Sequence, residues 1–324
     1  MGSPSAAAKK PDEPPLPAGS ARRGAGGERA VWARGAWARS ARWVIPLAPA
    51  LFLLLAFFAG PILWTVWASF TNAALTGAQA AQTEFVGTAN FEQLLSDPRF
   101  RAATVLTVIF LVGCVFGQTV LGLALALLLQ NRNGAVRATV GAIVVGAWVV
   151  PEVVAGFVWY AFLEREGSLN AILAVLGAGD QNWLFTAPLL AVVLANIWKG
   201  TAFSMMTYSA GLSEVPEDLK EAARVDGASG FQVLWHVVLP LLRRTLATTL
   251  LLITLQTVQV FTLIFVMTSG GPGARSTTLP LLMYQEALQM GDLGYGTAIA
   301  LALLVVAGLF SVVYVWMLRK EETR

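Results

Sequence analysis

Charged side chains are scarce in this sequence, and so are the residues that build metal sites and hydrolytic active sites. Lysine, arginine, aspartate and glutamate make up 13% of the 324 residues, well below the roughly 25% usual for a soluble domain. The single cysteine, Cys114, excludes a disulfide framework and a thiolate zinc site. The single histidine, His236, leaves little material for Ser-His-Asp catalysis. The composition indicates a membrane protein rather than an enzyme, with no cofactor in this chain.

Apolar residues are what the sequence has in quantity, at 56% of the chain. A membrane-spanning helix needs about 20 mostly apolar residues. Six runs reach that length, and they cover residues 44–68, 102–130, 138–163, 187–210, 245–268 and 294–318. The second run contains Gly113, Gly117 and Gly122, and small residues let helix backbones approach closely in lipid. We predict an all-α membrane protein in which residues 44–318 form six transmembrane helices.

The distribution of basic residues sets the predicted orientation, because positively charged segments are retained in the cytoplasm. If six spans alternate, 17 of the 22 basic residues fall on the side that holds both termini. These are Lys9, Lys10, Arg22, Arg23, Arg29, Arg34, Arg39, Arg42, Arg132, Arg137, Lys220, Arg224, Arg243, Arg244, Arg319, Lys320 and Arg324. We predict cytoplasmic termini, with residues 1–43 as a disordered basic tail and residues 319–324 as a short end segment. The net charge of +3 follows from this bias and is no argument for nucleic acid.

The loop over residues 211–244 is polar but keeps a helical pattern. Pro216 and the acidic residues after it suit a helix start, and Gly227 suits its end, which predicts a helix over 215–225. Ser229 and Gln232 have the spacing of a capping box. We predict a second short amphipathic helix that ends at Pro240. On these grounds alone the pair fits equally well a simple connector on the membrane surface.

The spacing of residues inside this loop favours a more specific interpretation. A Glu-Ala-Ala triplet is followed, after three residues, by a glycine. After nine further residues comes a valine, and a single residue separates this valine from a Leu-Pro pair. The positions are Glu221, Ala222, Ala223, Gly227, Val237, Leu239 and Pro240. This pattern resembles the cytoplasmic EAA signature of binding-protein-dependent ABC importer permeases, with valine at 237 where isoleucine is typical. Residues 225–229 and the outer loop at 268–272 are similar to the carbohydrate branch, of maltose and glycerol-phosphate type.

The resemblance implies a function, a set of partners and a role for the loop. The chain is expected to be a permease subunit for a sugar in the cytoplasmic membrane of a prokaryote, working by alternating access. Its expected partners are a second permease, two ATPase subunits that carry ATP and magnesium, an extracytoplasmic sugar-binding protein and membrane lipid. The loop is expected to form a helix-turn-helix that docks on an ATPase. There Glu221 and Asp226 offer carboxylates to a basic partner, Ala222 and Ala223 leave a slim surface, and Gly227 permits the turn.

Polar residues inside the spans are candidates for the substrate path, because such residues tend to face a bundle interior. Amides recognise sugar hydroxyls, and aromatic faces cover sugar rings. The candidates are Gln118, Glu152, Asn196, Lys199, Gln256 and Gln259, with Trp159 and Tyr160 nearby. Gln256 and Gln259 form the preferred pair, because residues three apart on a helix share a face. Glu152 and Lys199 are alternatively expected to form an ion pair next to Pro151.

Three other functions stay open at this point. Lys199 leaves room for a permease of glycerol phosphate or another polyol derivative. An ion-coupled secondary transporter would show inverted repeats with matching helix breaks, and no such symmetry is visible in the sequence. A membrane-embedded enzyme would need a metal cluster or an activated nucleophile. The Gly-Gly-Pro segment at 270–272 is not a phosphate loop, because no Gly-Lys-Ser or Gly-Lys-Thr follows it.

Overall fold

The computed structural model describes residues 47–177 and 181–322. The chain divides into two compact units, Met1–Pro61 and Ile62–Arg324, and each is described by itself. The predicted tail at 1–43 lies outside the described residues. The described part is helical and contains no strand, only two isolated β-bridges, Thr71 with Phe85 and Ala74 with Asp292.

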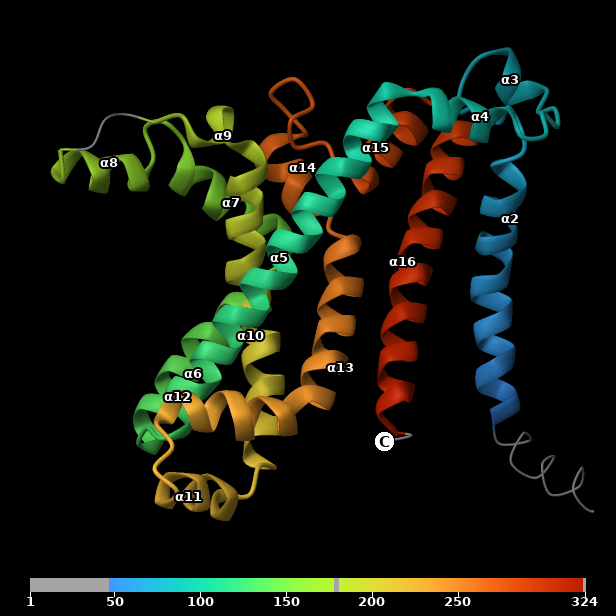
Figure 1. Cartoon of the computed structure of the whole chain (residues 1–324). Helices are drawn as coiled ribbons and strands as arrows, with labels where there is room; N and C mark the ends of the chain where they lie inside the picture. The colour runs from blue at the N-terminus through green and yellow to red at the C-terminus, as the bar shows by residue number, and fades with distance from the viewer. Residues whose placement is uncertain (1–46, 178–180, 323–324) are drawn as a thin grey trace, which may run out of the picture. The chain divides into compact units, whose positions relative to one another are not determined.

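The helices differ widely in length, and α5, α10 and α16 are the longest in the described part (Figure 1). Their bounds are η1 Leu55–Ala59, α2 Gly60–Ala68, α3 Ala78–Ala81, α4 Ala89–Ser96, α5 Pro98–Gln130, α6 Gly134–Val149, α7 Glu152–Leu163, α8 Ser168–Val175, α9 Trp183–Thr186, α10 Pro188–Ser213, α11 Glu217–Val225, α12 Gly230–Val233, η2 Leu234–Val238, α13 Leu239–Val258, α14 Thr262–Thr268, α15 Leu279–Tyr284, η3 Gln285–Gln289 and α16 Leu293–Glu322.

Five helices in the described part are long and apolar enough to cross a membrane, and there are six candidates if a bent pair of helices is counted as one span. The five are Leu47–Ala68, Pro98–Gln130, Pro188–Ser213, Gly230–Val258 and Leu293–Tyr314. In the first unit the described helix buries no residue, and Phe52 and Phe57 are each 70% exposed. Large apolar side chains that face outward suit a lipid solvent, so the predicted all-α membrane fold is confirmed.

The second unit is organised around α5 and α10, which lie side by side (Figure 1). Side chains of α10 fill the space above the glycines of α5. Val193 lies opposite Gly113, Ile197 opposite Gly117, and Ser204 opposite Gly122. The prediction that these small residues pack within the bundle is confirmed. The inner core of the unit, built on Tyr208 and Leu212 of α10, continues into the helix-turn-helix that follows.

The third predicted span, 138–163, is not one continuous helix. It is divided between α6 and α7, and the bent pair turns by 103°. Val150 has φ −57° and ψ 129°, and Pro151 has φ −55° and ψ 142°, so both are extended. Proline disfavours a helical residue before it and has no N–H to donate. The chain therefore leaves the helix at Val150 and starts a new one at Glu152.

The second helix of the loop does not end at Pro240, which corrects the prediction. It runs from Gly230 to Val258 as a single span candidate. The π-helix η2 lies just before the proline, and the N–H of Leu239 donates to the carbonyl oxygen of Leu234 five residues earlier. A π-turn shifts the hydrogen-bond register where Pro240 cannot donate. The π-helix η1 likewise ends two residues before a proline, Pro61.

The fifth predicted span, 245–268, is also interrupted. The helix ends at Val258 with Gln259 as its C-cap, and α14 starts at Thr262. The four-residue sequence Gln-Val-Phe-Thr at 259–262 thus contains the junction between the long helix and a short outer one. Leu263, Ile264 and Met267 of α14 are buried against the core that α7 and α10 share.

Candidate functional site

The helix-turn-helix is the first candidate region, and local contacts determine its shape. Ser229 Oγ accepts a hydrogen bond from the Gln232 N–H at 3.4 Å, and Gln232 Oε1 accepts one from the Ser229 N–H at 2.8 Å. The predicted capping box is therefore present. Pro216 is the N-cap of α11, with Glu217 and Asp218 in its first turn and Arg224 in its last. These charges match the helix dipole.

The turn between α11 and α12 depends on Gly227. This residue has φ +85°, in the left-handed region that side chains other than hydrogen rarely adopt. The Ala228 N–H donates to the Ala223 carbonyl at 2.9 Å, and the Gly227 N–H donates to the Arg224 carbonyl at 3.0 Å. Together these bonds form a Schellman motif, which satisfies the last carbonyls of α11 and sets the direction of the next helix.

A groove of about 310 Å³ lies between the two helices of this loop. Ala223, Asp226, Gly227 and Val237 line it, and so does His236, which the sequence analysis treated only as an isolated residue. The other predicted loop residues point elsewhere. Glu221 and Ala222 are exposed on α11 and Pro240 is exposed on α13, while Leu239 is half-buried. The structure therefore brings four of the eight predicted loop residues together.

A small cavity of about 150 Å³ lies where the bent pair meets α10 and α13. Its lining residues come from helices that are far apart in the sequence. They are Gln118, Trp148, Glu152, Asn196, Lys199, Gly200, Gln256, Thr257 and Val260. Five of the eight predicted substrate-path residues meet here, and they give the cavity a polar lining.

Amide side chains form part of the lining of this cavity. Gln118 Nε2 donates to the Asn196 carbonyl oxygen at 3.4 Å. The side chain of Gln118 crosses directly over Gly200, where any added Cβ would clash with its amide. Asn196 is 7% exposed, and its side chain lies within hydrogen-bonding reach of the Cys114 thiol. The amide side chains that this cavity brings together are those of Gln118, Asn196 and Gln256.

Lys199 does not form the predicted ion pair with Glu152. Its Nζ donates to the carbonyl oxygens of Trp148, at 3.0 Å, and Val150, at 2.7 Å. Both carbonyls belong to the end of α6, where the bend at Pro151 removes the helical donors. Glu152 is in the first turn of α7 instead. Each charge therefore lies at the helix end whose dipole it complements.

Three predicted path residues do not reach this cavity. Gln259 is the C-cap of α13, is exposed and does not line the cavity. Trp159 packs edge-on against Trp198, with ring centroids 6.1 Å apart. Tyr160 lines a separate outer cavity of about 340 Å³ that also includes Gly271. Trp148, which the sequence analysis did not select, takes the aromatic position in the cavity and lies just before the bend.

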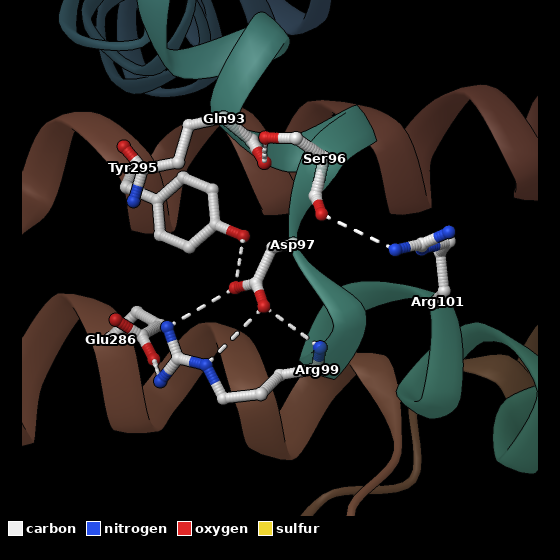
Figure 2. Close-up of polar contacts among 7 residues, drawn as sticks. All are labelled: Gln93, Ser96, Asp97, Arg99, Arg101, Glu286 and Tyr295. Carbon is white, nitrogen blue, oxygen red and sulfur yellow. Dashed lines mark hydrogen bonds and ion pairs between the residues drawn. The ribbon is translucent and has the colours of Figure 1, made fainter.

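A polar cluster at the end of the second unit away from the helix-turn-helix was not predicted (Figure 2). Arg99 Nη1 binds Glu286 Oε1 at 2.6 Å, and Arg99 Nη2 binds Asp97 Oδ2 at 3.1 Å. The Tyr295 hydroxyl donates to Asp97 Oδ2 at 2.9 Å. The cluster joins the start of α5, the π-helix η3 and the start of α16. The sequence Asp97-Pro98 indicates an N-cap, but nothing in it indicates partners that lie 187 and 198 residues away.

A carboxyl pKa is lowered at each end of the second unit, by different contacts. Burial raises the pKa of the Asp97 carboxyl, but hydrogen bonds from the Arg99 N–H and the Tyr295 hydroxyl, with the Arg99 guanidinium, outweigh it and leave the pKa below its usual value. At exposed Glu217, a hydrogen bond from Lys220 is the main cause of a lowered pKa. Lys220 itself is buried, and its Nζ lies 2.9 Å from Glu217 Oε2.

Residues 118–322 match the family described as the binding-protein-dependent transport system inner membrane component. This segment contains the helix-turn-helix, the cavity and both interrupted spans, and it covers more than half of the chain. The chain belongs to this family. It is a permease subunit of an ABC importer, a multi-pass membrane protein that transports rather than catalyses a reaction.

Two curated relatives of this permease are aligned over most of their length. The trehalose/maltose transport system permease protein MalF of Thermococcus litoralis is 36% identical, over 82% of this chain and 90% of that protein. The sulfoquinovosyl glycerol transport system permease protein SmoG of Agrobacterium fabrum is 32% identical, over 86% of this chain and 91% of that protein.

A solved structure has the same fold as this permease. It is a bacterial alginate ABC transporter in complex with an alginate pentasaccharide-bound periplasmic protein. The TM-score is 0.74 at 22% identity, over 87% of this chain and 95% of that chain. Family membership excludes the ion-coupled secondary transporter and the membrane-embedded enzyme considered above, and it assigns ATP hydrolysis to separate subunits.

Proposed function

We propose that this permease carries a sugar, delivered by an extracytoplasmic binding protein, through the cavity at the bent span. The relative that supports this substrate class is the trehalose/maltose permease of Thermococcus litoralis, at 36% identity. The single observation that carries the proposed path is the cavity itself, which brings the amide residues Asn196 and Gln256 together with Trp148. Amides suit sugar hydroxyls, and an indole face suits a sugar ring.

Uptake into proteoliposomes tests this path, with the assembled transporter and its loaded binding protein. Gln256→Ala and Asn196→Ala each remove one hydrogen-bonding group, worth about 1–3 kcal/mol, so we expect uptake to fall by about 5- to 100-fold while the complex still assembles. Gln259→Ala is the matched control, because this glutamine lies three residues away and does not line the cavity. Equal effects at 256 and 259, or none at 256 and 196, would contradict the path.

Phosphorylated polyols are a less suitable substrate for this cavity. Lys199 is the cation that would attract a phosphate, but two of its donors are used by the carbonyls of Trp148 and Val150. The carboxylate of Glu152 lines the same cavity and would repel an anion. These contacts favour an uncharged sugar over glycerol phosphate.

The proposed partners are a second, related permease and two ATPase subunits, with the helix-turn-helix docked on one ATPase. The exposed carboxylates of Glu221 and Asp226 and the groove beside Gly227 support this docking. We expect Glu221→Lys to insert normally and to lose transport, because it replaces a carboxylate offered to a basic partner by a like charge. ATPase activity that still responds fully to loaded binding protein would contradict the docking.

The proposed orientation places both termini in the cytoplasm, with residues 1–43 as a cytoplasmic tail, 44–318 as the permease domain and 319–324 as the end segment. Within the second unit, α11, α12 and the C-terminal end of α16 lie at one end (Figure 1). Cysteines introduced at Ser3 and Glu322, with Cys114 replaced by alanine, are expected to react with an impermeant reagent only after permeabilisation. Labelling of either position in intact cells would contradict this orientation.

A further inference from the structure

The bend between α6 and α7 leaves backbone carbonyls without helical donors in the middle of a membrane span. In a continuous helix, the carbonyl oxygen of Trp148 would accept from residue 152 and that of Val150 from residue 154. The extended conformation at Val150 and Pro151 removes both bonds. Unsatisfied carbonyls are expensive in lipid, so interrupted helices persist only where another group satisfies the freed atoms.

Lys199 is that group. It lies near the middle of α10, which is a continuous helix from Pro188 to Ser213. Its Nζ donates to the Trp148 and Val150 carbonyl oxygens at 3.0 and 2.7 Å. An ammonium at the C-terminal end of α6 also complements the negative end of that helix dipole. One side chain on a continuous helix therefore supplies donors to two of the freed carbonyls, together with a matching charge.

We infer that Lys199 is a positioning residue. It holds the two halves of the bent span against α10, and it thereby forms the cavity wall that carries Trp148 and Glu152. Both of these residues flank the carbonyls that Lys199 binds, and both line the cavity with it. Release of the ammonium would free the end of α6 from α10. The side chains of Trp148 and Glu152 would then lose their fixed positions relative to Asn196. Lys199 acts on transport through these neighbours and does not contact the substrate.

The inference rests on the proposed function only for the role of the cavity as the sugar path, so the first test avoids transport. It is the melting temperature, Tm, of the purified transporter complex without sugar or binding protein. Lys199→Met leaves two carbonyls unpaired, and we expect Tm to fall by about 5 °C. Lys199→Arg keeps two donors and should retain most of the Tm. A lysine that is reserved for a substrate would contribute nothing to the empty protein, so an unchanged or raised Tm in Lys199→Met overturns the inference.

A double-mutant cycle with Pro151→Ala tests whether Lys199 serves the bend. Alanine restores an N–H and permits a helical residue before it, so the carbonyls can regain donors within the helix. We expect Lys199→Met to lower Tm clearly less when it is combined with Pro151→Ala than when it is made in the natural protein. Additive effects on Tm would show that the lysine acts independently of the bend, and they would overturn the inference.

Uptake kinetics form the last test. Misplacement of positioning groups costs about 10- to 100-fold in rate, so Lys199→Met should lower the maximal uptake rate by that factor while Lys199→Arg restores it. The failure of this inference and that of the proposed path are distinguishable. If the cavity is not the path, Asn196→Ala leaves uptake unchanged while Lys199→Met still lowers Tm. If Lys199 binds an anion instead, its replacement abolishes uptake of an acidic sugar alone and leaves Tm unchanged, which overturns the inference.

Discussion

The two ends of the second unit are both rich in charged residues, but they are held together in different ways. At one end, the helix-turn-helix is stabilised by contacts between neighbours in the sequence, such as Lys220 with Glu217 and Ser229 with Gln232. At the other, Arg99 joins Asp97 to Glu286 across 187 residues (Figure 2). Local contacts survive when a segment moves as a body, whereas long-range contacts persist only while their elements keep their positions. The first end therefore makes these polar contacts within one segment of the chain, whereas the second uses them to join three separate helices.

Among the substitutions that test this difference between the two ends, Gly227→Val is expected to have the largest effect. In Gly227→Val, a β-branched residue must adopt φ +85°, at a cost of about 1–3 kcal/mol. Because no neighbouring atom lies within 4 Å of the added Cβ, the strain is in the backbone and is relieved by redirecting α12. We expect normal insertion, transport lowered at least about tenfold, and ATP hydrolysis that no longer responds to loaded binding protein.

Gly230→Ala is the matched control for this variant. Gly230 lies three residues away, has an ordinary helical φ and also has open space around it. Alanine there should leave uptake and stimulated hydrolysis unchanged. If both glycine variants behave alike, the turn conformation at 227 does not direct the second helix.

The next largest effect is expected on the stability of the protein, at the polar cluster around Arg99. Arg99→Met leaves the carboxylates of Asp97 and Glu286 unpaired, although their side chains are only 9% and 8% exposed. We expect a loss of about 2–3 kcal/mol, below the 3–5 of a fully buried pair because the guanidinium is 57% exposed. Thermal unfolding of the complex measures it. Arg101→Met is the control, since Arg101 reaches only the Ser96 carbonyl, at 3.4 Å.

Glu286→Gln added to Arg99→Met sharpens this test. The second substitution removes one of the two uncompensated charges, so we expect part of the lost Tm to return. A double variant that is less stable than Arg99→Met would mean that the carboxylate of Glu286 is stabilised by something other than Arg99.

A smaller effect is expected from acid. Since the folded pKa of Asp97 lies below its ordinary value of 3.8, the ionised carboxylate stabilises the fold fully above that value. The contribution is lost as pH falls from there through the folded pKa, because the folded state must then take up a proton. We expect Tm to decline over this range in the natural protein and less steeply in Asp97→Asn. Parallel declines in the two proteins would exclude Asp97 as a source of the acid sensitivity.

The smallest effect is expected at Glu217. Its carboxylate is exposed, although Lys220 is buried, and the contact lies within one helical turn. Glu217→Gln retains an oxygen that accepts from the Lys220 ammonium, and the charge that is lost is the solvent-screened one. Tm and uptake should match those of the natural protein within error. A loss comparable with that of Arg99→Met would show that the two ends are not built as differently as their contacts indicate.

The difference between local and long-range contacts also explains which features could be predicted from the sequence. Local chemistry predicted a helix over 215–225, which the structure begins two residues later at Glu217, and it predicted the capping box of Ser229 and the turn at Gly227, because each depends on a few consecutive residues. Hydrophobic run length predicted the number of spans. Pro240 was misjudged, since its missing N–H is compensated by the π-helix before it rather than by a helix end. The bounds of α13 depend on the packing of α14 against α7 and α10, which no local pattern records.

The candidate site was predictable as a set of residue types but not as an arrangement. Among the polar residues predicted from the apolar runs, Asn196, Gln256 and Gln118 line one cavity. The opposite charges of Lys199 and Glu152 suggested an ion pair. The lysine instead binds backbone carbonyls, and residue types do not show which carbonyls are free. Trp148 was missed because its relevance comes from the bend that follows it. The partners of Arg99 were missed because residues 97 and 286 meet only in the folded chain.

The bend at Pro151 has a consequence for how the protein is made. Synthesis proceeds from the N-terminus, so α6 and α7 leave the ribosome about 50 residues before Lys199 does. Until α10 has inserted, the carbonyls of Trp148 and Val150 have no ammonium to bind, and the half-span that carries Glu152 is a poor candidate for the lipid interior. Residence of this segment at the translocon until α10 arrives would resolve the difficulty. The distance along the chain between the bend and α10 therefore affects the order in which the helices insert as well as the final fold.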